Sequence, residues 1–291
     1  MKSNSGRILL TILVGLLNLS PIIAYSYLTK TTPPIILAHR AGAVIVPENT
    51  IQGWSQVREK YAPQVWELDI WLSADDSLMV FHDKIVDRVT DGTGTLKELS
   101  YEQLRQLDAA YWFDPAGDST FPYRGKGFKI PTLGEVLDSF PTDFFNVEVK
   151  DSTTDIVFKL VDLLKKKGAE DKVLIASEHT EILECFRDLA PNIATSGSAD
   201  EIRPLVIWGK LGLAFLPAAP MQVVQVPEYA GATHVVTSAF VKQCHSRGIL
   251  VHVWTINDSK TMRKLLELGV DGIITDRPDI ALKVYKFMGY R

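Results

Sequence analysis

The sequence predicts a single (β/α)8 barrel, because short β-branched runs alternate with helical patterns from residue 35 onwards. Eight such runs are present, which is the number that closes a barrel of this type. The chain has 291 residues, of which 46% are hydrophobic, enough for one large core. The expected strands are Ile35–His39, Val65–Ile70, Phe144–Val149, Lys172–Ala176, Ile193–Gly197, Val223–Val226, Ile249–Thr255 and Gly272–Thr275.

Helical patterns between these runs complete the alternation. One covers Asn49–Lys60, with Asn49 as the expected N-cap, and another covers Ser259–Leu268 and ends at Gly269. The segment from about residue 84 to residue 129, between the second and third strands, is rich in Asp, Gly, Tyr and Phe. We expect it to be a functional insertion, because the loops after the strands build the active site in this fold.

Residues 1–30 predict a hydrophobic helix that exports the protein or anchors it in a membrane. Lys2 and Arg7 precede an apolar run over residues 8–28 that is interrupted once by polar residues. About 20 residues can span a bilayer, whereas a shorter apolar centre followed by Ala24-Tyr25-Ser26 suits a cleaved signal. We favour the uncleaved anchor. In both cases the positive charges come first, so the domain over residues 31–291 is expected to face away from the cytoplasm.

The polar, proline-bearing segment from Thr29 to Pro34 is expected to be a tether outside the core. On this interpretation an anchored barrel holds its mouth close to the bilayer. Trp112, Phe113 and Phe121 of the insertion would then meet lipid-derived substrates.

Charge and cysteine content limit the partners. From residue 31 onwards, 28 basic and 35 acidic residues give a net charge of −7. Nucleic acid is therefore excluded as an expected partner, because its binding depends on a basic surface. Cys185 and Cys244 are too few and too far apart for a disulfide framework or a thiolate metal site, and we expect ordinary buried thiols.

Three carboxylates are expected at the carboxyl ends of neighbouring strands. Glu67 and Asp69 lie two residues apart and therefore point to the same face, and Glu148 has the matching place on the next strand. Any one of them alone would be an ordinary surface carboxylate. Burying all three without a counter-charge is costly, so together they predict a site for one divalent cation, Mg²⁺ or Ca²⁺.

Histidines and basic residues are expected at the same rim. His39 ends the first strand and His82 follows an apolar run, and imidazole exchanges protons near neutral pH, so both are candidates for acid and base catalysis. Arg40 and Lys150 supply positive charge that either grips a phosphate or pairs with the carboxylates. The histidines expected to be structural or exposed are His179, His234, His245 and His252.

Many short motifs, in one order over residues 35 to 285, resemble the glycerophosphodiester phosphodiesterase family. None would be persuasive alone, but their order and spacing are specific. The first are His39-Arg40, Pro47-Glu48-Asn49-Thr50, Glu67-Leu68-Asp69 and His82-Asp83. Further matches are Asp87-Arg88-Val89-Thr90-Asp91-Gly92-Thr93-Gly94, Ile130-Pro131-Thr132-Leu133, Asn146-Val147-Glu148-Val149-Lys150, Trp254-Thr255-Ile256-Asn257 and Gly269-Val270-Asp271-Gly272-Ile273-Ile274-Thr275-Asp276-Arg277-Pro278.

The resemblance implies a TIM-barrel enzyme that cleaves glycerophosphodiesters to glycerol 3-phosphate and an alcohol, with relatives that act on lysophospholipids. Either water or the adjacent glycerol hydroxyl can be the nucleophile, and we favour the hydroxyl for its effective concentration. The implied site residues are Glu67, Asp69 and Glu148 for one divalent ion, His39 and His82 as acid and base, Arg40 and Lys150 for the phosphate, and Trp254 as an apolar wall.

Two other functions stay open. The anchor and the sequence Tyr111-Trp112-Phe113 favour lysophospholipase D or phospholipase C-like cleavage of membrane lipids. The chain could instead be an inactive lipid- or phosphodiester-binding barrel, although every acid, base and ligand position is present.

One departure from the family concerns the turn after the first strand. The family usually reads His-Arg-Gly, whereas this chain reads His39-Arg40-Ala41-Gly42. If the turn needs a positive φ at this place, Ala41 is mildly strained or the turn has shifted.

Overall fold

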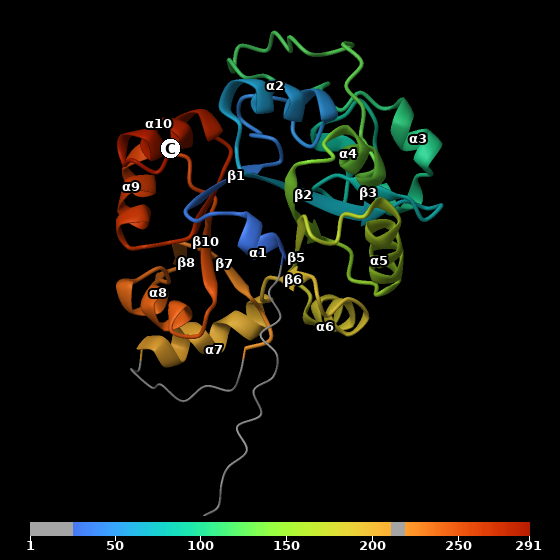
Figure 1. The fold of residues 1–291 in the computed structure, drawn as a ribbon. Coiled ribbons are helices and arrows are strands. Elements are labelled where there is room, and N and C mark those ends of the chain that lie inside the picture. The colour runs from blue at the N-terminus through green and yellow to red at the C-terminus, as the bar shows by residue number, and fades with distance from the viewer. Residues whose placement is uncertain (1–25, 211–218) are drawn as a thin grey trace, which may run out of the picture.

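Eight parallel strands close into a barrel in the computed structural model, which describes residues 26–210 and 219–291 (Figure 1). The order around the sheet is β6-β5-β4-β2-β1-β11-β10-β7, and a parallel bridge between Ser196 and Val223 joins its two ends. The short strand β3 (Leu78–Val80) pairs antiparallel with β2. The barrel strands are β1 (Ile35–His39), β2 (Val65–Leu72), β4 (Phe144–Val149), β5 (Val173–Ser177), β6 (Ala194–Thr195), β7 (Val223–Pro227), β10 (Leu250–Trp254) and β11 (Gly272–Thr275).

The predicted strand positions are confirmed, with shifts of one or two residues at some ends. The largest difference is at β6, where the expected five residues reduce to Ala194–Thr195. A second short pair, β8 (Tyr229–Ala230) and β9 (Thr233–His234), forms a small hairpin after β7.

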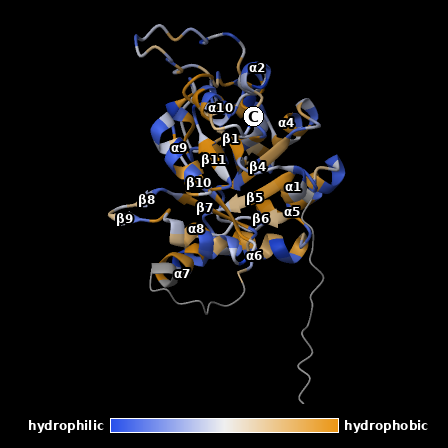
Figure 2. Cartoon of the chain, turned by 60° about the vertical axis from the view of Figure 1, so that its left-hand side comes forward, coloured by the Kyte–Doolittle hydropathy of each residue, from blue (hydrophilic) through white to orange (hydrophobic). Residues whose placement is uncertain are grey.

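Helices surround the barrel, and their apolar faces pack on the outer face of the sheet (Figures 1 and 2). One apolar layer lies over β1, β2, β4 and β5, and a second lies over β7, β10 and β11. The described helices are α1 (Ser26–Lys30), α2 (Ile51–Tyr61), α3 (Tyr101–Gln106), α4 (Leu133–Ser139), α5 (Asp155–Lys167), α6 (Thr180–Leu189), α7 (Ala199–Lys210), α8 (Ser238–His245), α9 (Ser259–Glu267) and α10 (Pro278–Phe287), with 3-10 turns η1 (Val86–Arg88) and η2 (Leu96–Glu98).

The N-terminal end of the barrel is closed by α1. Tyr27 is 1% exposed and packs edge-on against Phe144, with ring centroids 6.0 Å apart, in an apolar cluster that includes Ile35 and Val65. Thr31 is also buried, and its hydroxyl donates to the Tyr27 carbonyl. The tether expected over residues 29–34 is therefore wrong at Thr31, which packs into the barrel floor, the end of the barrel that α1 closes, whereas Thr29, Lys30, Thr32 and Pro33 are exposed. Tyr27 was expected in the apolar run over residues 8–28, and it also belongs to the floor.

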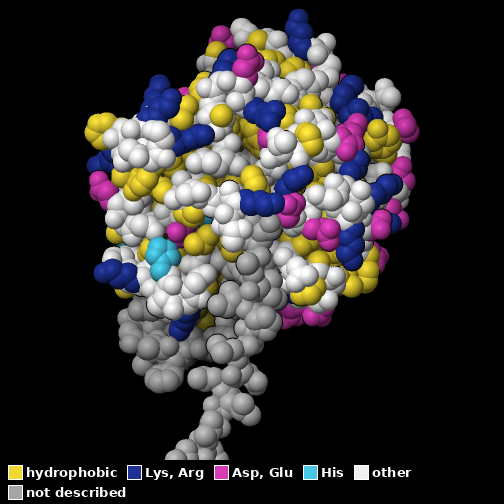
Figure 3. Space-filling view, viewed as in Figure 1, with side chains coloured by type: hydrophobic (Ala, Val, Ile, Leu, Met, Phe, Trp, Pro, Cys, Tyr) yellow, Lys and Arg dark blue, Asp and Glu magenta, His cyan; other side chains and the backbone are white. Residues whose placement is uncertain are grey.

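α1 lies at the opposite end of the barrel from the mouth, where the barrel strands have their carboxyl ends. Figure 1 shows α1 at the centre of the ring of helices, and Figure 2 shows it at the opposite end of the barrel from the β8–β9 hairpin. Basic and acidic side chains are interspersed over the visible part of the floor face (Figure 3).

Most of the predicted anchor cannot be compared with the structure, since residues 1–25 lie outside the described part of the chain. Among the helices of residues 26–210 and 219–291, none is both long enough and apolar enough to cross a membrane.

The insertion between β2 and β4 carries a small apolar core of its own. Met79, Phe81, Leu96, Leu104 and Ile130 are buried together in it. It contains η1, η2 and α3, and its outer loop forms the long green trace at the edge of Figure 1. A packed insertion of this kind can hold charged side chains over the mouth with defined geometry.

Candidate active site

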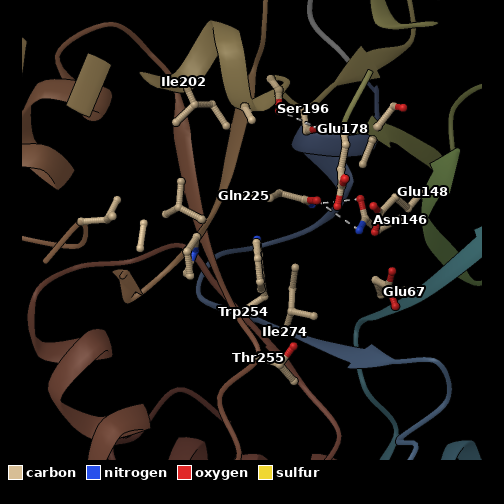
Figure 4. Close-up of a pocket in the computed structure, with 18 of the residues that line it drawn as sticks. Glu67, Asn146, Glu148, Glu178, Ser196, Ile202, Gln225, Trp254, Thr255 and Ile274 are labelled. Atoms are coloured by element: carbon tan, nitrogen blue, oxygen red, sulfur yellow. Dashed lines mark hydrogen bonds between the residues drawn. The ribbon is translucent and has the colours of Figure 1, made fainter. Parts of the chain in front are cut away.

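The mouth at the carboxyl end of the strands opens into a cavity of about 880 Å³. It brings together seven of the eight site residues predicted from the sequence, and the eighth, Asp69, lies fully buried beside them. Carboxylates gather on one side of the cavity, and Ile202 lies on the other (Figure 4). The seven residues that line it are His39, Arg40, Glu67, His82, Glu148, Lys150 and Trp254.

The three predicted metal ligands converge. Register pairs Asp69 with Glu148 on adjacent strands, and each of Glu67, Asp69 and Glu148 offers a carboxylate oxygen within 4.8 Å of the others. Glu67 is 2% exposed and Asp69 0% exposed. Asp69 Oδ1 is buried and, among the described residues, has the Lys150 ammonium at 3.3 Å but no hydrogen bond of good geometry. This donor set fits a hard divalent cation.

The crowded carboxylates differ in their proton affinity. Burial, and then the neighbouring Asp69 carboxylate, raise the pKa of Glu67 to about 8. Burial would also raise the pKa of Asp69, but Lys150 and Arg40 outweigh it and lower that pKa. Asp69 is therefore the carboxylate of the pair whose ionised form its surroundings favour.

Two basic side chains lie against this cluster. Lys150 Nζ is 2.7 Å from Glu148 Oε1 and 3.3 Å from Asp69 Oδ1, and Arg40 Nε is 3.3 Å from Asp69 Oδ2. The alternative role that the sequence left open for Arg40 and Lys150, ion pairing with the carboxylates, is thus present. Both also line the cavity.

Asn49 has a different role from the predicted one. The N-cap of α2 is Thr50, whose hydroxyl accepts a hydrogen bond from the Gly53 amide at 3.1 Å. Asn49 precedes the cap with φ at +53° and donates from Nδ2 to Asp69 Oδ2 at 3.1 Å. The loop before α2 therefore orients a carboxylate of the cluster.

His39 is held by a carboxylate that sequence reasoning missed. Its Nδ1 lies 2.6 Å from Asp276 Oδ1, and Asn257 Nδ2 donates to Asp276 Oδ2 at 2.8 Å. Burial would lower the pKa of His39, but the Glu67 charge and the Asp276 hydrogen bond outweigh it and raise that pKa. Nε2 of His39 lies 3.8 Å from Glu67 Oε2. This arrangement fits a general acid or base whose second ring nitrogen is oriented by a carboxylate.

His82 has a similar partner. Its Nδ1 lies 2.5 Å from Asp83 Oδ1, and the other oxygen of Asp83 accepts a hydrogen bond from Arg88 Nε. Burial would raise the pKa of Asp83, but its bonds to His82 and Arg88 outweigh it and lower that pKa far below its ordinary range. Asp83 is therefore an ionised acceptor, so Nδ1 of His82 carries the hydrogen.

The turn after β1 is strained, as the departure from the family motif suggested. Arg40, Ala41 and Gly42 have φ of +49°, +73° and +98°. Ala41 thus occupies the left-handed region with its methyl group fully buried. At Gly42 an added Cβ would lie 3.1 Å from the Pro278 ring, so this position has little room for a side chain.

Below the carboxylates, an amide pair crosses the barrel. Gln225 Nε2 donates to Asn146 Oδ1 at 2.9 Å, and the pair is drawn as dashed lines in Figure 4. Glu178, at the end of β5, also lines the cavity. No local sequence pattern predicts the contact between Asn146 and Gln225, because the two residues are far apart in the chain.

The apolar part of the cavity comes from other elements than expected. Its lining includes Ile202, Val206 and Ile207 of α7, Val226 of β7 and Val235 after β9, together with the predicted Trp254. The insertion aromatics do not line it: Trp112 and Phe121 pack around the Arg124 guanidinium, and Phe113 packs on Tyr123.

The four histidines that were expected to be structural or exposed have different surroundings. His252 is fully buried, His245 pairs with Asp271 at 2.7 Å, and His234 stacks on Tyr229. His179, in contrast, lines the cavity. Cys244 is buried as predicted, and Cys185 is half-buried.

Known proteins share this fold and sequence pattern. Residues 39–280 match the model of the glycerophosphoryl diester phosphodiesterase family. A glycerophosphodiester phosphodiesterase of Bacillus subtilis is 31% identical over 98% of this chain and 99% of its own, and one of Caldanaerobacter subterraneus is 30% identical over 87% and 98%.

Solved structures show the same fold. A putative glycerophosphoryl diester phosphodiesterase of Silicibacter pomeroyi aligns with a TM-score of 0.76 at 22% identity, covering 91% of this chain and 98% of that one. An Oleispira antarctica phosphodiesterase in complex with the product sn-glycerol 3-phosphate aligns with a TM-score of 0.71 at 24% identity, covering 91% and 99%. The chain belongs to the glycerophosphoryl diester phosphodiesterase family and is an enzyme of that class.

Proposed function

We propose that this enzyme hydrolyses glycerophosphodiesters to glycerol 3-phosphate and an alcohol, using one divalent cation and two histidines. The observation that carries the proposal is the convergence of Glu67, Asp69 and Glu148 between His39 and His82 at one cavity. The product held by the Oleispira relative supports the choice of substrate.

Glu67, Asp69 and Glu148 would hold the cation, which we propose to be Mg²⁺ or Ca²⁺ because all the ligands are hard oxygens. A bound divalent ion would stabilise negative charge on the phosphoryl oxygens. Arg40 and Lys150 line the same cavity and would bind the remaining phosphate charge.

His39 and His82 would divide the proton transfers. Each has Nδ1 bound to an aspartate, so Nε2 is the nitrogen left to exchange a proton with the substrate. One histidine takes a proton from the attacking hydroxyl, and the other gives one to the departing alkoxide, which is too basic to leave unprotonated at neutral pH. The attacking group is the glycerol hydroxyl next to the phosphate, as favoured from the sequence, so departure of the alcohol leaves a cyclic phosphate. Water then opens this cyclic phosphate to give glycerol 3-phosphate.

The proposal is tested by metal removal and by leaving-group chemistry. Chelation should abolish release of glycerol 3-phosphate, and Mg²⁺ or Ca²⁺ should restore it.

His39→Ala and His82→Ala should each lower kcat by about 10²–10⁴-fold. A substrate with a very acidic leaving alcohol should rescue only one of the two variants. Equal rescue of both would contradict separate acid and base roles.

A second candidate activity is cleavage of lysophospholipids, favoured by the apolar side of the cavity on α7 and β7. A human lysophospholipase D is 24% identical over 83% of this chain. Ile207 lines the cavity and is 50% exposed, so Ile207→Ser should leave the fold intact. If an acyl chain binds there, this variant should lose kcat/KM for a lysophospholipid and keep it for the deacylated diester.

We also propose that residues 1–25 bring the enzyme to a membrane or across it, with the barrel outside the cytoplasm. Lys2 and Arg7 before the apolar run support this orientation. Protease added to intact cells should degrade an anchored barrel, and secreted barrel should appear in the medium. Protection of the barrel in intact cells would contradict the proposal.

A further inference from the structure

Arg88, in η1 of the insertion, joins two acidic residues that support the catalytic site. Its Nη1 and Nη2 donate to the two oxygens of Glu48 at 2.9 and 2.7 Å, and its Nε donates to Asp83. Asp83 holds His82, and Glu48 Oε1 lies 3.4 Å from Arg40 Nη1. The Arg88 guanidinium thus contacts the proposed catalytic His82 through Asp83 and the proposed phosphate-binding Arg40 through Glu48.

Arg88 does not itself face the substrate. The described lining of the active-site cavity includes His82 and Arg40 but not Arg88. Arg88 and Glu48 instead line a neighbouring cavity of about 380 Å³ with Val89 and Trp112. Any effect of Arg88 on catalysis must therefore pass through Asp83 and Glu48.

We propose that Arg88 is a positioning residue that fixes His82 and Arg40 together, so that the insertion controls one of the two proton transfers. This inference rests on the proposed roles of His82 and Arg40. Arg88 uses three donors in a fixed planar fork, which a lysine cannot reproduce. A displaced carboxylate at Asp83 would leave His82 free to rotate, and small misplacements of a catalytic group cost large factors in rate.

The two catalytic histidines differ in this support. Asp276, which orients His39, is bound by Asn257 from the loop after β10, within the barrel itself. Asp83, which orients His82, depends on an arginine of the insertion whose side chain is 48% exposed. Loss of Arg88 should therefore impair the step served by His82 and spare the step served by His39.

The first test compares Arg88→Met, Arg88→Lys and the control Arg58→Met. The Arg58 side chain is also 48% exposed and pairs with Asp143, away from the cavity lining. With a water-soluble glycerophosphodiester, Arg88→Met should lower kcat by about 10- to 100-fold with a smaller change in KM. Arg88→Lys should recover little of the loss, and Arg58→Met should match the unchanged enzyme.

The second test combines Arg88→Met with each histidine variant. If Arg88 acts through His82, adding Arg88→Met to His82→Ala should reduce kcat by much less than it does in the unchanged enzyme. Added to His39→Ala, it should reduce kcat by its full factor. A substrate with an acidic leaving alcohol should change the kcat of Arg88→Met in the same direction as it changes the kcat of His82→Ala. Asp83→Asn, which keeps the size of the side chain, should show the same dependence of kcat on the two histidine variants and on the leaving alcohol.

These outcomes separate the inference from the proposed function. If the unchanged enzyme releases no glycerol 3-phosphate from glycerophosphodiesters, the proposed function fails. If it does, but Arg88→Met behaves as Arg58→Met, or lowers kcat equally in the His82→Ala and His39→Ala backgrounds, the positioning role is wrong.

Discussion

At the scale of single residues, the site depends on carboxylates that hold a histidine by the nitrogen facing away from the substrate. Asp276 has this role for His39, at 2.6 Å. Asn257 fixes Asp276 twice: its Nδ2 donates to the carboxylate at 2.8 Å, and its Oδ1 accepts from the Asp276 backbone N–H at 2.9 Å. The His39 bond outweighs the effect of burial and lowers the pKa of Asp276, so the carboxylate stays ionised. His39 therefore presents Nε2 to the cavity in a fixed orientation.

Asp276→Asn should test this arrangement. An amide can still contact His39 but cannot stabilise its protonated ring, so kcat should fall by about 10²-fold while the melting temperature changes little. The raised pKa of His39 should also return towards its ordinary value, which NMR titration of the ring protons would measure. An unchanged His39 titration would contradict the role of Asp276.

The burial of His252 should make the free energy of unfolding depend on pH. It is fully buried in β10, and neither ring nitrogen has a hydrogen-bond partner among the described residues. Burial lowers its pKa from 6.5 to about 3. Below pH 6.5 the unfolded chain therefore binds a proton that the folded chain does not, and the stability from this residue is lost as the pH falls.

His252→Leu should remove that loss. Between pH 7 and pH 4.5 the histidine should cost about 2–3 kcal/mol of unfolding free energy, since a shifted group contributes up to about 1.4 kcal/mol per pH unit. Urea unfolding at the two pH values measures this difference in the unchanged enzyme and in the variant. If both chains lose the same stability on acidification, His252 does not carry the effect.

At the scale of elements, β6 is the shortest strand of the barrel wall. Only Ala194 and Thr195 pair as a strand, and side chains supply the rest of the support. Arg187 of α6 donates to the Thr195 hydroxyl at 2.8 Å and to the Ser196 carbonyl at 2.9 Å, and it pairs with Glu201 of α7 at 2.6 Å. A half-buried arginine thus adds hydrogen bonds where the short strand has few of its own.

Arg187→Met should destabilise the fold by about 3 kcal/mol, because it leaves Glu201 without its counter-charge in a poorly solvated site. Adding Glu201→Gln should recover part of the loss, since the amide still accepts the Ser198 N–H bond without an unpaired charge. Arg203→Met, which breaks an exposed pair with Asp200, serves as the control and should change little. If denaturant unfolding showed the same loss of unfolding free energy for Arg187→Met and Arg203→Met, the interpretation would be wrong.

The same elements show what the sequence could predict. The strands were predictable because β-branched runs recur between helical patterns, and Glu67 and Asp69 because their spacing of two places them on one face of a strand end. Asp276 was not assigned, because its contact with His39 joins residues 237 positions apart and depends on closure of the barrel. The packing of Trp112 around Arg124 was missed for a similar reason, since an exposed aromatic run does not show what it will contact.

At the scale of the whole molecule, the floor and the mouth of the barrel are separate units. The floor is apolar and closed by α1, whereas the mouth carries the carboxylates, the histidines and the insertion. The sequence suggested that the segment before the first strand was a tether, because a short polar stretch with two prolines has no packing signal of its own. The side chain of Tyr27 becomes buried only when strands from both halves of the chain pack around it.

Truncation distinguishes the floor from the segment before it. A chain beginning at residue 26 should keep the stability and the activity of the full chain on a water-soluble glycerophosphodiester, because α1 is intact. A chain beginning at residue 31 loses Tyr27 and the two hydrogen bonds that the Tyr27 carbonyl accepts from Thr31. It should unfold with about 3–5 kcal/mol less free energy, the usual cost of removing a buried aromatic side chain.

Activity should respond differently from stability, since α1 lies at the opposite end of the barrel from the site. Well below the melting temperature, the chain beginning at residue 31 should therefore retain its kcat. Tyr27→Ala in the chain beginning at residue 26 is the matched control and should reproduce most of the loss in stability. If the two truncated chains melted at the same temperature, α1 would not be part of the folded barrel; if kcat fell in proportion to the lost stability, the floor and the mouth would be coupled rather than separate.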